Sequence, residues 1–327
     1  MGSAIPRGGF GTADQLAVLM SIEPVVKQQT DNHLARRKLW FPNELMSADE
    51  QMPPEADAEL ARVRDAARGL PDAVRVSVAL NLLTEEGLPH FHRLIAIHLG
   101  YESEWSRWNN VWTAEEDRHG CALRDYVRDA RLFNMGALEK LQYAYIESSF
   151  NPDWEHDPYR LLAYTSLQER ATQVAHANTG RACGTYEPKI QSILAHIAAD
   201  ESRHYDFYRN AFNEILRRDT NRALESLLHV MPALAMPGHL MPGYDQMAEV
   251  VRRGDLYGPR HYAKIVSDLL AFWKIDALSG LSATGRAIQE KLMKIPARLE
   301  KLAAYADRKT TARSFAFDFL YGRTIAL

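Results

Sequence analysis

Apolar positions recur at helical spacing along the chain from Glu55 onward, and alternating apolar and polar runs typical of strands are scarce. Glycine and proline residues interrupt this pattern and separate the predicted helices. The pattern predicts helices over 55–68, 72–100, 103–131, 135–148, 158–186, 188–217, 219–230, 243–253, 259–275 and 283–305. Pro89 falls inside the second of these, so we expect a kink or a helix end there.

The pattern is weaker at the N-terminus. We expect residues 1–30 to form a flexible lead-in and the proline-containing segment 31–54 to wrap the body as an extended arm. Nothing in the pattern marks a second domain. We therefore predict that residues 31–327 form one all-α domain, a ferritin-like bundle with a four-helix core and additional C-terminal helices.

Each of four long predicted helices has one face on which a glutamate lies at helical spacing from mostly apolar or aromatic residues. These faces are Val78, Leu82 and Glu85; Trp105, Trp108, Trp112, Glu116, His119 and Leu123; Thr165, Glu169, Thr172 and His176; and Leu194, Ile197, Glu201, His204 and Tyr208. The third face is the most polar of the four. Because such a face is expected to point into the core, we predict that its glutamate is buried.

The acids on these faces belong to a repeat, in which one glutamate is followed 31 or 32 residues later by a Glu-x-x-His motif. The two copies consist of Glu85, Glu116 and His119, and of Glu169, Glu201 and His204. A Glu-x-x-His motif on a helix presents both side chains on one face. One such motif from each of two helices, with one glutamate from each of two others, is the ligand set of di-iron carboxylate bundles.

Burial of four facing carboxylates requires compensation, because each unpaired buried charge costs several kcal/mol. Two divalent cations would neutralise four glutamates. Carboxylate and imidazole ligands suit iron or manganese, whereas structural zinc sites favour thiolates. The repeat therefore predicts a dinuclear site. The alternative for each motif alone is a solvent-exposed helix face, since helices contain many glutamates.

Composition narrows the function classes. The net charge of −3 gives no reason to expect general affinity for nucleic acid or for anionic membranes. No apolar run approaches the roughly 18 residues of a membrane span. The two cysteines are far apart in the sequence and form no Cys-x-x-Cys motif, which suits a reducing cytoplasm.

Longer strings around the repeat resemble one family, the soluble acyl-carrier-protein desaturases of the plastid type. The sequence TEEGLP at 84–89 resembles the family's TEEALP, and WTAEEDRHG at 112–120 resembles WTAEENRHG. The strings QERAT at 168–172 and AADESRH at 198–204 are similar to the family's QERAT and AADEKRH. The resemblance extends from about Trp40 to about Arg298.

The resemblance implies a role for each matching position. The six residues of the repeat match the ligands of two iron ions, with O₂ as co-substrate. Thr172 matches a threonine beside the O₂ pocket, although a helix-interior threonine that bonds its own backbone is the alternative. Asp200 matches an acid that holds an iron-ligating histidine. Trp40 matches a tryptophan linked to that acid on an electron route, and a simple packing role is its alternative.

The implied activity is O₂-dependent introduction of a cis double bond into an acyl chain bound to acyl carrier protein. By resemblance, we expect a ferredoxin or a similar protein as electron donor, and a homodimer. Lys38 matches a basic position of the family, and with Arg37 it is a candidate contact for the acidic carrier. A solvated run of charges is the alternative.

The chain departs from the plant enzymes between Pro89 and Trp105, where the connection is shorter and carries His90, His92 and His98. We expect these histidines to lie at a partly exposed helix end. The departure leaves chain length and double-bond position open. Two alternative functions also stay open: a di-iron acyl-carrier-protein hydroxylase, and a non-enzymatic ferritin-like iron-binding protein.

Overall fold

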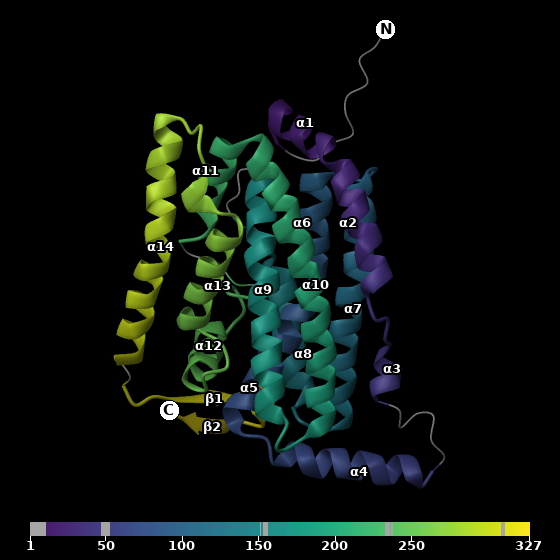
Figure 1. Ribbon diagram of the computed structural model, residues 1–327. Helices are drawn as coiled ribbons and strands as arrows, with labels where there is room; N and C mark the ends of the chain where they lie inside the picture. Colours follow the sequence, from purple (N-terminus) through teal and green to yellow (C-terminus); the bar gives the residue numbers. More distant parts are fainter. Residues whose placement is uncertain are drawn as a thin grey trace.

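The computed structural model describes residues 11–46, 53–150, 152, 156–232, 236, 238–308 and 311–327, and these form a bundle of helices with one short hairpin (Figure 1). The α-helices are α1 Ala13–Ser21, α2 Glu23–Arg36, α3 Pro42–Leu45, α4 Glu55–Arg68, α5 Asp72–Glu85, α6 Leu88–Leu99, α7 Glu104–Asp129, α8 Met135–Ser148, α9 Pro158–Cys183, α10 Pro188–Arg218, α11 Thr220–Val230, α12 Tyr244–Arg253, α13 Pro259–Phe272 and α14 Ala283–Arg308. The strands are β1 Ser314–Phe317 and β2 Arg323–Ala326, and the short 3₁₀ helices are η2 Ile275–Ala277 and η3 Asp318–Leu320. The predicted all-α fold class is confirmed.

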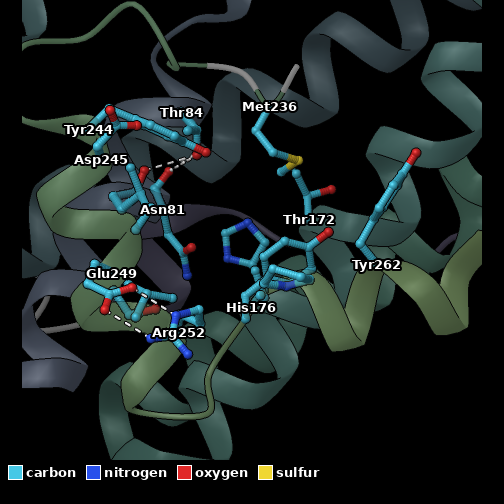
Figure 2. A pocket seen from close by; sticks show the side chains of 18 of the residues that line it. Asn81, Thr84, Thr172, His176, Met236, Tyr244, Asp245, Glu249, Arg252 and Tyr262 are labelled. Atoms are coloured by element: carbon cyan, nitrogen blue, oxygen red, sulfur yellow. Dashed lines mark hydrogen bonds and ion pairs between the residues drawn. The ribbon is translucent and has the colours of Figure 1, made fainter. Parts of the chain in front are cut away.

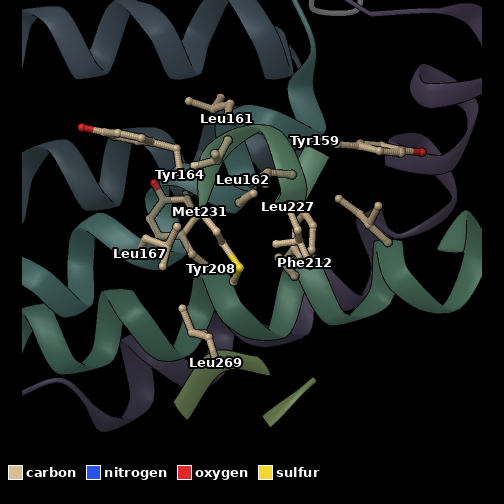
Figure 3. Packing of buried hydrophobic residues seen from close by; sticks show 14 of the residues in the cluster. Tyr159, Leu161, Leu162, Tyr164, Leu167, Tyr208, Phe212, Leu227, Met231 and Leu269 are labelled. Atoms are coloured by element: carbon tan, nitrogen blue, oxygen red, sulfur yellow. The ribbon is translucent and has the colours of Figure 1, made fainter. Parts of the chain in front are cut away.

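Helices α5, α7, α9 and α10 form the four-helix core. Helix α5 packs on α7 and α9, and α10 packs on the same two helices, which closes the ring. The C-terminal helices continue the bundle on one side, where α11 and α13 pack on α9 and α14 packs on α11 and α13 (Figure 1). Figure 3 shows apolar side chains such as Leu162, Phe212 and Leu227 filling the space between α9, α10 and α11.

The four faces predicted to point inward are buried, including the more polar face of α9. Thr165, Glu169, Thr172 and His176 are each at most 7% exposed. Local signals set the starts of the long helices. The Asp157 side chain accepts hydrogen bonds from the first turn of α9, and Glu187 does the same for α10. A proline follows each of these caps, as helix starts favour.

The predicted helix end near Pro89 is confirmed. Helix α5 stops at Glu85, and α6 begins at Leu88 with Pro89 in its first turn. Gly87 lies in the break, where a Cβ atom would come within 2.9 Å of Tyr145 Cε1 and 3.0 Å of the Thr84 carbonyl oxygen. Close approach of α8 therefore requires glycine here, and it leaves Glu85 as the last residue of α5.

Two predictions for the N-terminal region are wrong in part. Residues 13–30 belong to α1 and α2 rather than to a flexible lead-in, because Leu19, Ile22 and Val26 recur at helical spacing and are buried in the core. Among the described residues of the predicted arm over 31–54, the extended part is at 37–41, between α2 and α3. Residues 1–10 and 47–52 lie outside the described residues.

Two of the three histidines of α6 differ from expectation as well, whereas His92 is half-buried as expected. His90 and His98 are 7% and 3% exposed, because α6 packs on α7 and α9. His98 Nδ1 lies 2.8 Å from the Leu94 carbonyl oxygen, and His92 Nδ1 lies 2.7 Å from Thr113 Oγ1. Among the described residues, no cluster with metal-ligand spacing includes any of the three.

The C-terminal hairpin was not predicted. Strands β1 and β2 pair antiparallel, with Phe315 opposite Ile325. Phe317, Phe319, Leu320 and Ile325 are buried against the end of the bundle, and the Tyr321 hydroxyl donates to the Phe133 carbonyl oxygen at 3.0 Å. Both cysteines are free thiols. Within the described part of the chain, no helix combines the length and apolar character needed to cross a membrane.

Candidate metal centre

The four core helices bring the six residues of the sequence repeat together in the interior. Each of the six is at most 7% exposed. They form two groups whose potential ligand atoms lie within 4.8 Å of one another. The first group is Glu85, Glu116, His119 and Glu201, and the second is Glu116, Glu169, Glu201 and His204. Glu116 and Glu201 belong to both groups, so they lie between two potential ion positions.

Each half of the cluster has one imidazole facing its carboxylates. His119 Nδ1 lies 3.2 Å from Glu201 Oε1 and 3.6 Å from Glu85 Oε2. On the other side, His204 Nδ1 lies 2.9 Å from Glu116 Oε1 and 3.7 Å from Glu169 Oε2. The arrangement offers each ion one nitrogen, one carboxylate of its own and two shared carboxylates.

The charges and the unsatisfied polar atoms of the cluster are those expected of a cation-binding site. Burial, reinforced by the nearby Glu201 carboxylate, raises the pKa of Glu169 well above its ordinary value, and the same causes raise the pKa of Glu116. Five inward atoms lie close to one another but form no hydrogen bond of good geometry among the described residues, namely Glu116 Oε1, Glu169 Oε2, Glu201 Oε1, His119 Nδ1 and His204 Nδ1. Buried polar atoms are normally paired, so these atoms fit two bound cations. Their oxygen and nitrogen donor set suits iron or manganese.

The outer nitrogens of the two histidines are held by acids from the opposite motif. His119 Nε2 lies 3.2 Å from Asp200 Oδ2, and His204 Nε2 lies 2.9 Å from Glu115 Oε2. Such acids fix the orientation of a ligating imidazole and increase its basicity. Asp200 was predicted in this position and Glu115 was not. Both acids directly precede the glutamate of a Glu-x-Arg-His motif, so the repeat contained the signal.

Trp40 lies on the outer side of Asp200. Its indole Nε1 donates to Asp200 Oδ2 at 2.8 Å, and its ring stacks on that of His119 at 6.1 Å between centroids. Arg118 also donates to Asp200 Oδ2, at 3.2 Å. Burial acts to raise the pKa of Asp200, but the hydrogen bond from His119 and nearby positive charge lower it overall. The expected Trp40–Asp200 link is present.

Glu115 is the centre of a second polar cluster. Its carboxylate lies 2.9 Å from His33 Nε2 and 3.0 Å from Arg37 Nη1, in addition to its contact with His204. Burial opposes ionisation, yet the hydrogen bonds from His204 and His33 hold the pKa of Glu115 far below its usual range. The His33–Glu115–His204 group has metal-ligand spacing, but its carboxylate is already satisfied by donors. Arg37, a predicted carrier contact, is thus tied to Glu115, whereas Lys38 is exposed.

Thr172 contacts both the centre and its own helix. Its hydroxyl lies 3.1 Å from Glu201 Oε2, 3.1 Å from the Glu169 carbonyl oxygen and 3.2 Å from the Gln168 carbonyl oxygen. One hydroxyl proton can serve only one of these acceptors at a time. Both interpretations of this residue therefore have a geometric basis.

Two further contacts to the carboxylates were not predicted. The Trp112 indole Nε1 donates to Glu169 Oε1 at 3.1 Å, and His176 Nε2 lies 2.6 Å from Glu85 Oε1. Both residues belong to the inward faces found in the sequence, but nothing in their spacing distinguishes a hydrogen-bond donor to an acid from a packing residue.

Two cavities lie beside the cluster. The smaller, of about 20 Å³, is bordered by Glu85, Glu116 and Thr172 among others. The larger, of about 430 Å³, is lined mainly by apolar and aromatic residues from α5, α9, α12, α13 and α14 (Figure 2). Thr84 and Thr172 border both cavities. The larger pocket thus ends within one residue layer of the carboxylates.

The sequence is similar to those of several known proteins. The chain is 33% identical over 293 residues to a protein of Mycobacterium tuberculosis named as an acyl-[acyl-carrier-protein] desaturase, DesA1, and the match covers 87% of this chain and 86% of the relative. It is 30% identical to the chloroplastic stearoyl-[acyl-carrier-protein] 9-desaturase of Ricinus communis, and the match covers 89% of this chain and 77% of that protein. The chloroplastic stearoyl-[acyl-carrier-protein] 9-desaturase 3 of Arabidopsis thaliana is 31% identical, and the match covers 96% of this chain and 83% of that protein.

The fold has a solved counterpart in an X-ray structure of a Mycobacterium tuberculosis protein described as an acyl-ACP desaturase, DesA2. The TM-score is 0.61 at 20% identity, over 83% of this chain and 99% of that chain. A model of the fatty acid desaturase family matches residues 14–321. With the matched relatives, this shows that the chain is an enzyme of the fatty acid desaturase family.

Proposed function

We propose that this enzyme is an O₂-dependent acyl-carrier-protein desaturase that introduces a cis double bond into a carrier-bound acyl chain. The relatives named as acyl-carrier-protein desaturases support this substrate class. The main structural support is the cluster of six buried carboxylate and imidazole side chains, whose inward atoms form no hydrogen bond of good geometry, next to a mainly apolar pocket. Two iron ions held there would supply the O₂-dependent oxidation.

The protein's own residues prepare that site. Glu116 and Glu201 are the proposed shared ligands, and each remaining glutamate serves one ion. Asp200 and Glu115 accept hydrogen bonds from the outer imidazole nitrogens and hold both rings in place. The Thr172 hydroxyl can turn from the α9 backbone toward the centre, where it would be able to donate a hydrogen bond to O₂.

The larger pocket is the proposed channel for the acyl chain. Its mainly apolar and aromatic wall would shield the chain from water, and Thr84 and Thr172 join it to the small cavity at the carboxylates. Asp245 and Pro259 are the exposed residues of its lining, so the carrier-linked end of the substrate belongs on that side. The shape of the pocket would position two adjacent carbons of the acyl chain beside the carboxylate cluster.

Electrons are proposed to enter through Trp40, from a ferredoxin or a similar donor. The indole connects Asp200 and His119 to a surface on which Leu39 and Phe41 are 52% and 51% exposed. We further propose a homodimer of single-domain subunits.

The two alternatives make different predictions for one experiment. The iron-loaded enzyme is incubated with O₂, ferredoxin, its reductase, NADPH and acyl carrier proteins of several chain lengths, and the products are analysed by mass spectrometry. Loss of two hydrogens supports desaturation, and gain of one oxygen indicates hydroxylation. Iron oxidation without any change of the acyl chain indicates an iron-binding protein. The comparisons favour the first outcome.

The ligand assignment is tested separately. Replacing Glu116 or His204 by Ala is expected to remove most bound iron and to abolish turnover, because each replacement deletes a charge or a donor inside the buried cluster. Iron per chain is measured by elemental analysis after gel filtration. A variant that keeps its full iron content and activity refutes the assignment of that residue.

A further inference from the structure

Asn81 of α5 and His176 of α9 place polar groups in the wall of the large, otherwise mainly apolar pocket (Figure 2). Their side chains are 6% and 1% exposed. Asn81 Nδ2 and His176 Nδ1 have no hydrogen-bond partner among the described residues. Because buried polar atoms are nearly always paired, these two mark a position for a polar group of a ligand.

The contact between His176 and Glu85 uses one nitrogen of the imidazole ring and leaves the other for a ligand. His176 Nε2 lies 2.6 Å from Glu85 Oε1. A glutamate that ligates a cation is ionised and can only accept, so Nε2 carries the imidazole proton and donates it. His176 Nδ1 is then the ring nitrogen left without a partner, and the Asn81 amide offers an N–H donor. A hydroxyl group both donates and accepts, so it can pair with each atom whichever role that atom takes, whereas a carbonyl oxygen can only accept.

The pair lies close to the reacting end of the pocket. Asn81 precedes Glu85 by four residues, which is about 6 Å along the helix. His176 follows Thr172 by one helical turn, and Thr172 borders the small cavity at the carboxylates. A substrate atom bound between Asn81 and His176 is therefore only a few carbon atoms from the carbons beside the centre.

We propose that Asn81 and His176 bind an oxygen atom of the acyl substrate, and that the preferred substrate is a hydroxyacyl chain whose hydroxyl lies on the carrier side of the reacting carbons. This inference rests on the proposed function. The thioester carbonyl is a second source of the same oxygen contact, and it reaches the pair only when the double bond is introduced near the thioester.

Affinity for matched substrates tests the inference. The full-length, iron-loaded protein is titrated without reductant with carrier protein bearing hexadecanoyl, β-hydroxyhexadecanoyl or δ-hydroxyhexadecanoyl chains. One of the hydroxylated chains is expected to bind about 3- to 10-fold more tightly than the unsubstituted chain, as one or two buried hydrogen bonds provide. The near-isosteric Asn81→Leu variant should bind all three chains alike, with unchanged iron content.

Tyr262→Phe is the matched control. Tyr262 lines the same pocket, but its hydroxyl already donates to the Met231 carbonyl oxygen at 2.8 Å. Its removal should leave the preference for the hydroxylated chain intact. Activity is not needed for this comparison, so the binding difference reports on the pocket alone.

The outcomes separate the two oxygen sources and the proposed function itself. Equal affinity of the wild type for all chains, with a shift of double-bond position in Asn81→Leu, supports the thioester carbonyl as the bound oxygen. Wild-type affinities and double-bond position that are both unchanged in Asn81→Leu overturn the inference and assign the two atoms to bound water. If no carrier-bound chain binds at all, the proposed function fails and the inference fails with it.

Discussion

Glu115 and Asp200 have equivalent places in the centre although they lie in different surroundings. Each accepts a hydrogen bond from the outer nitrogen of the opposite motif's histidine. Asp200 is also bonded to Trp40 and Arg118, whereas Glu115 is bonded to His33 and Arg37. The repeat thus places an acid behind each imidazole, and the N-terminal segment 33–40 completes both arrangements.

Glu115→Gln is expected to lower iron affinity about tenfold, because an amide accepts a weaker hydrogen bond from His204 and leaves His33 and Arg37 without their counter-charge. Iron retained during competition with a chelator measures the effect. The control is Glu139→Gln, since Glu139 is 58% exposed and pairs only loosely with Arg124 at 3.6 Å. Equal retention in both variants would contradict a role for Glu115 in holding His204.

Glu249 gives a pH dependence with a definite sign. Hydrogen bonds from Arg252, and from Arg253 in addition, lower its pKa from 4.5 to about 2, against the effect of burial. Because the folded-state pKa lies below the unfolded value, the carboxylate stabilises the protein above pH 4.5. This contribution is lost as pH falls from about 4.5 to about 2.

The variant Glu249→Gln should therefore have a lower melting temperature than the wild type at neutral pH, and the difference should shrink as the pH falls through this range. Thermal unfolding followed by circular dichroism at several pH values measures it. A constant difference across the range would show that the carboxylate charge is not the cause.

At the scale of elements, the break between α5 and α6 positions the centre. It allows α5 to end at Glu85 while α6 turns to pack on α7 and α9. Tyr145 of α8 fills the space above Gly87. A side chain at 87 would have to displace either this buried ring or the α5 backbone.

Gly87→Ala is expected to destabilise the fold by about 1–3 kcal/mol, as overpacking of a closed site does. Gly136→Ala is the control, because a Cβ atom there meets only Asn134 Oδ1 at 3.6 Å and alanine favours the helix. Chemical denaturation measures both variants. A Gly87→Ala protein as stable as the control would mean that Tyr145 moves aside at no cost.

Most helices could be predicted because their ends carry local signals, such as the caps and prolines of α9 and α10. Helices α1 and α2 were missed because a glycine-rich start and a later proline cluster obscured a short apolar spacing. The hairpin was missed because its strands have four residues each and gain their stability from packing on α7 and α8.

The same distinction applies to the site. The six inward residues could be predicted because two helical motifs repeat along the chain. The contacts of His33, Trp112 and His176 with acids could not, because a contact with an acid on another helix leaves no spacing signal in the sequence. Their partners are between 57 and 91 residues away in the chain, and only the packed bundle brings them together.

At the scale of the whole molecule, the two approaches to the centre come from different sides of the bundle. The large pocket is formed where α12, α13 and α14 face α5 and α9. Trp40 and Lys38 lie between α2 and α3, which pack on α7 and α10 (Figure 1). The acyl substrate and the proposed electron donor can therefore contact the same chain at the same time.

This separation predicts distinct effects of two charge reversals. Lys38→Glu should raise the KM for ferredoxin several-fold and leave the KM for the acyl carrier unchanged, because exposed Lys38 adjoins the surface at Trp40. Complementary charges on two proteins mainly increase the rate at which they associate. Arg260→Glu should do the reverse, because Arg260 is 73% exposed at the start of α13, next to Pro259 of the pocket lining.

Both effects should weaken as salt is added, since screening reduces interactions between exposed charges. Steady-state kinetics with each partner varied in turn, at two ionic strengths, measures them, and iron content serves as the control for folding. If Lys38→Glu instead raises the KM for the acyl carrier alone, the carrier docks on the α2–α3 side, as the sequence-based assignment of Lys38 predicted. The acyl chain would then have to reach the carboxylates by a route other than the large pocket.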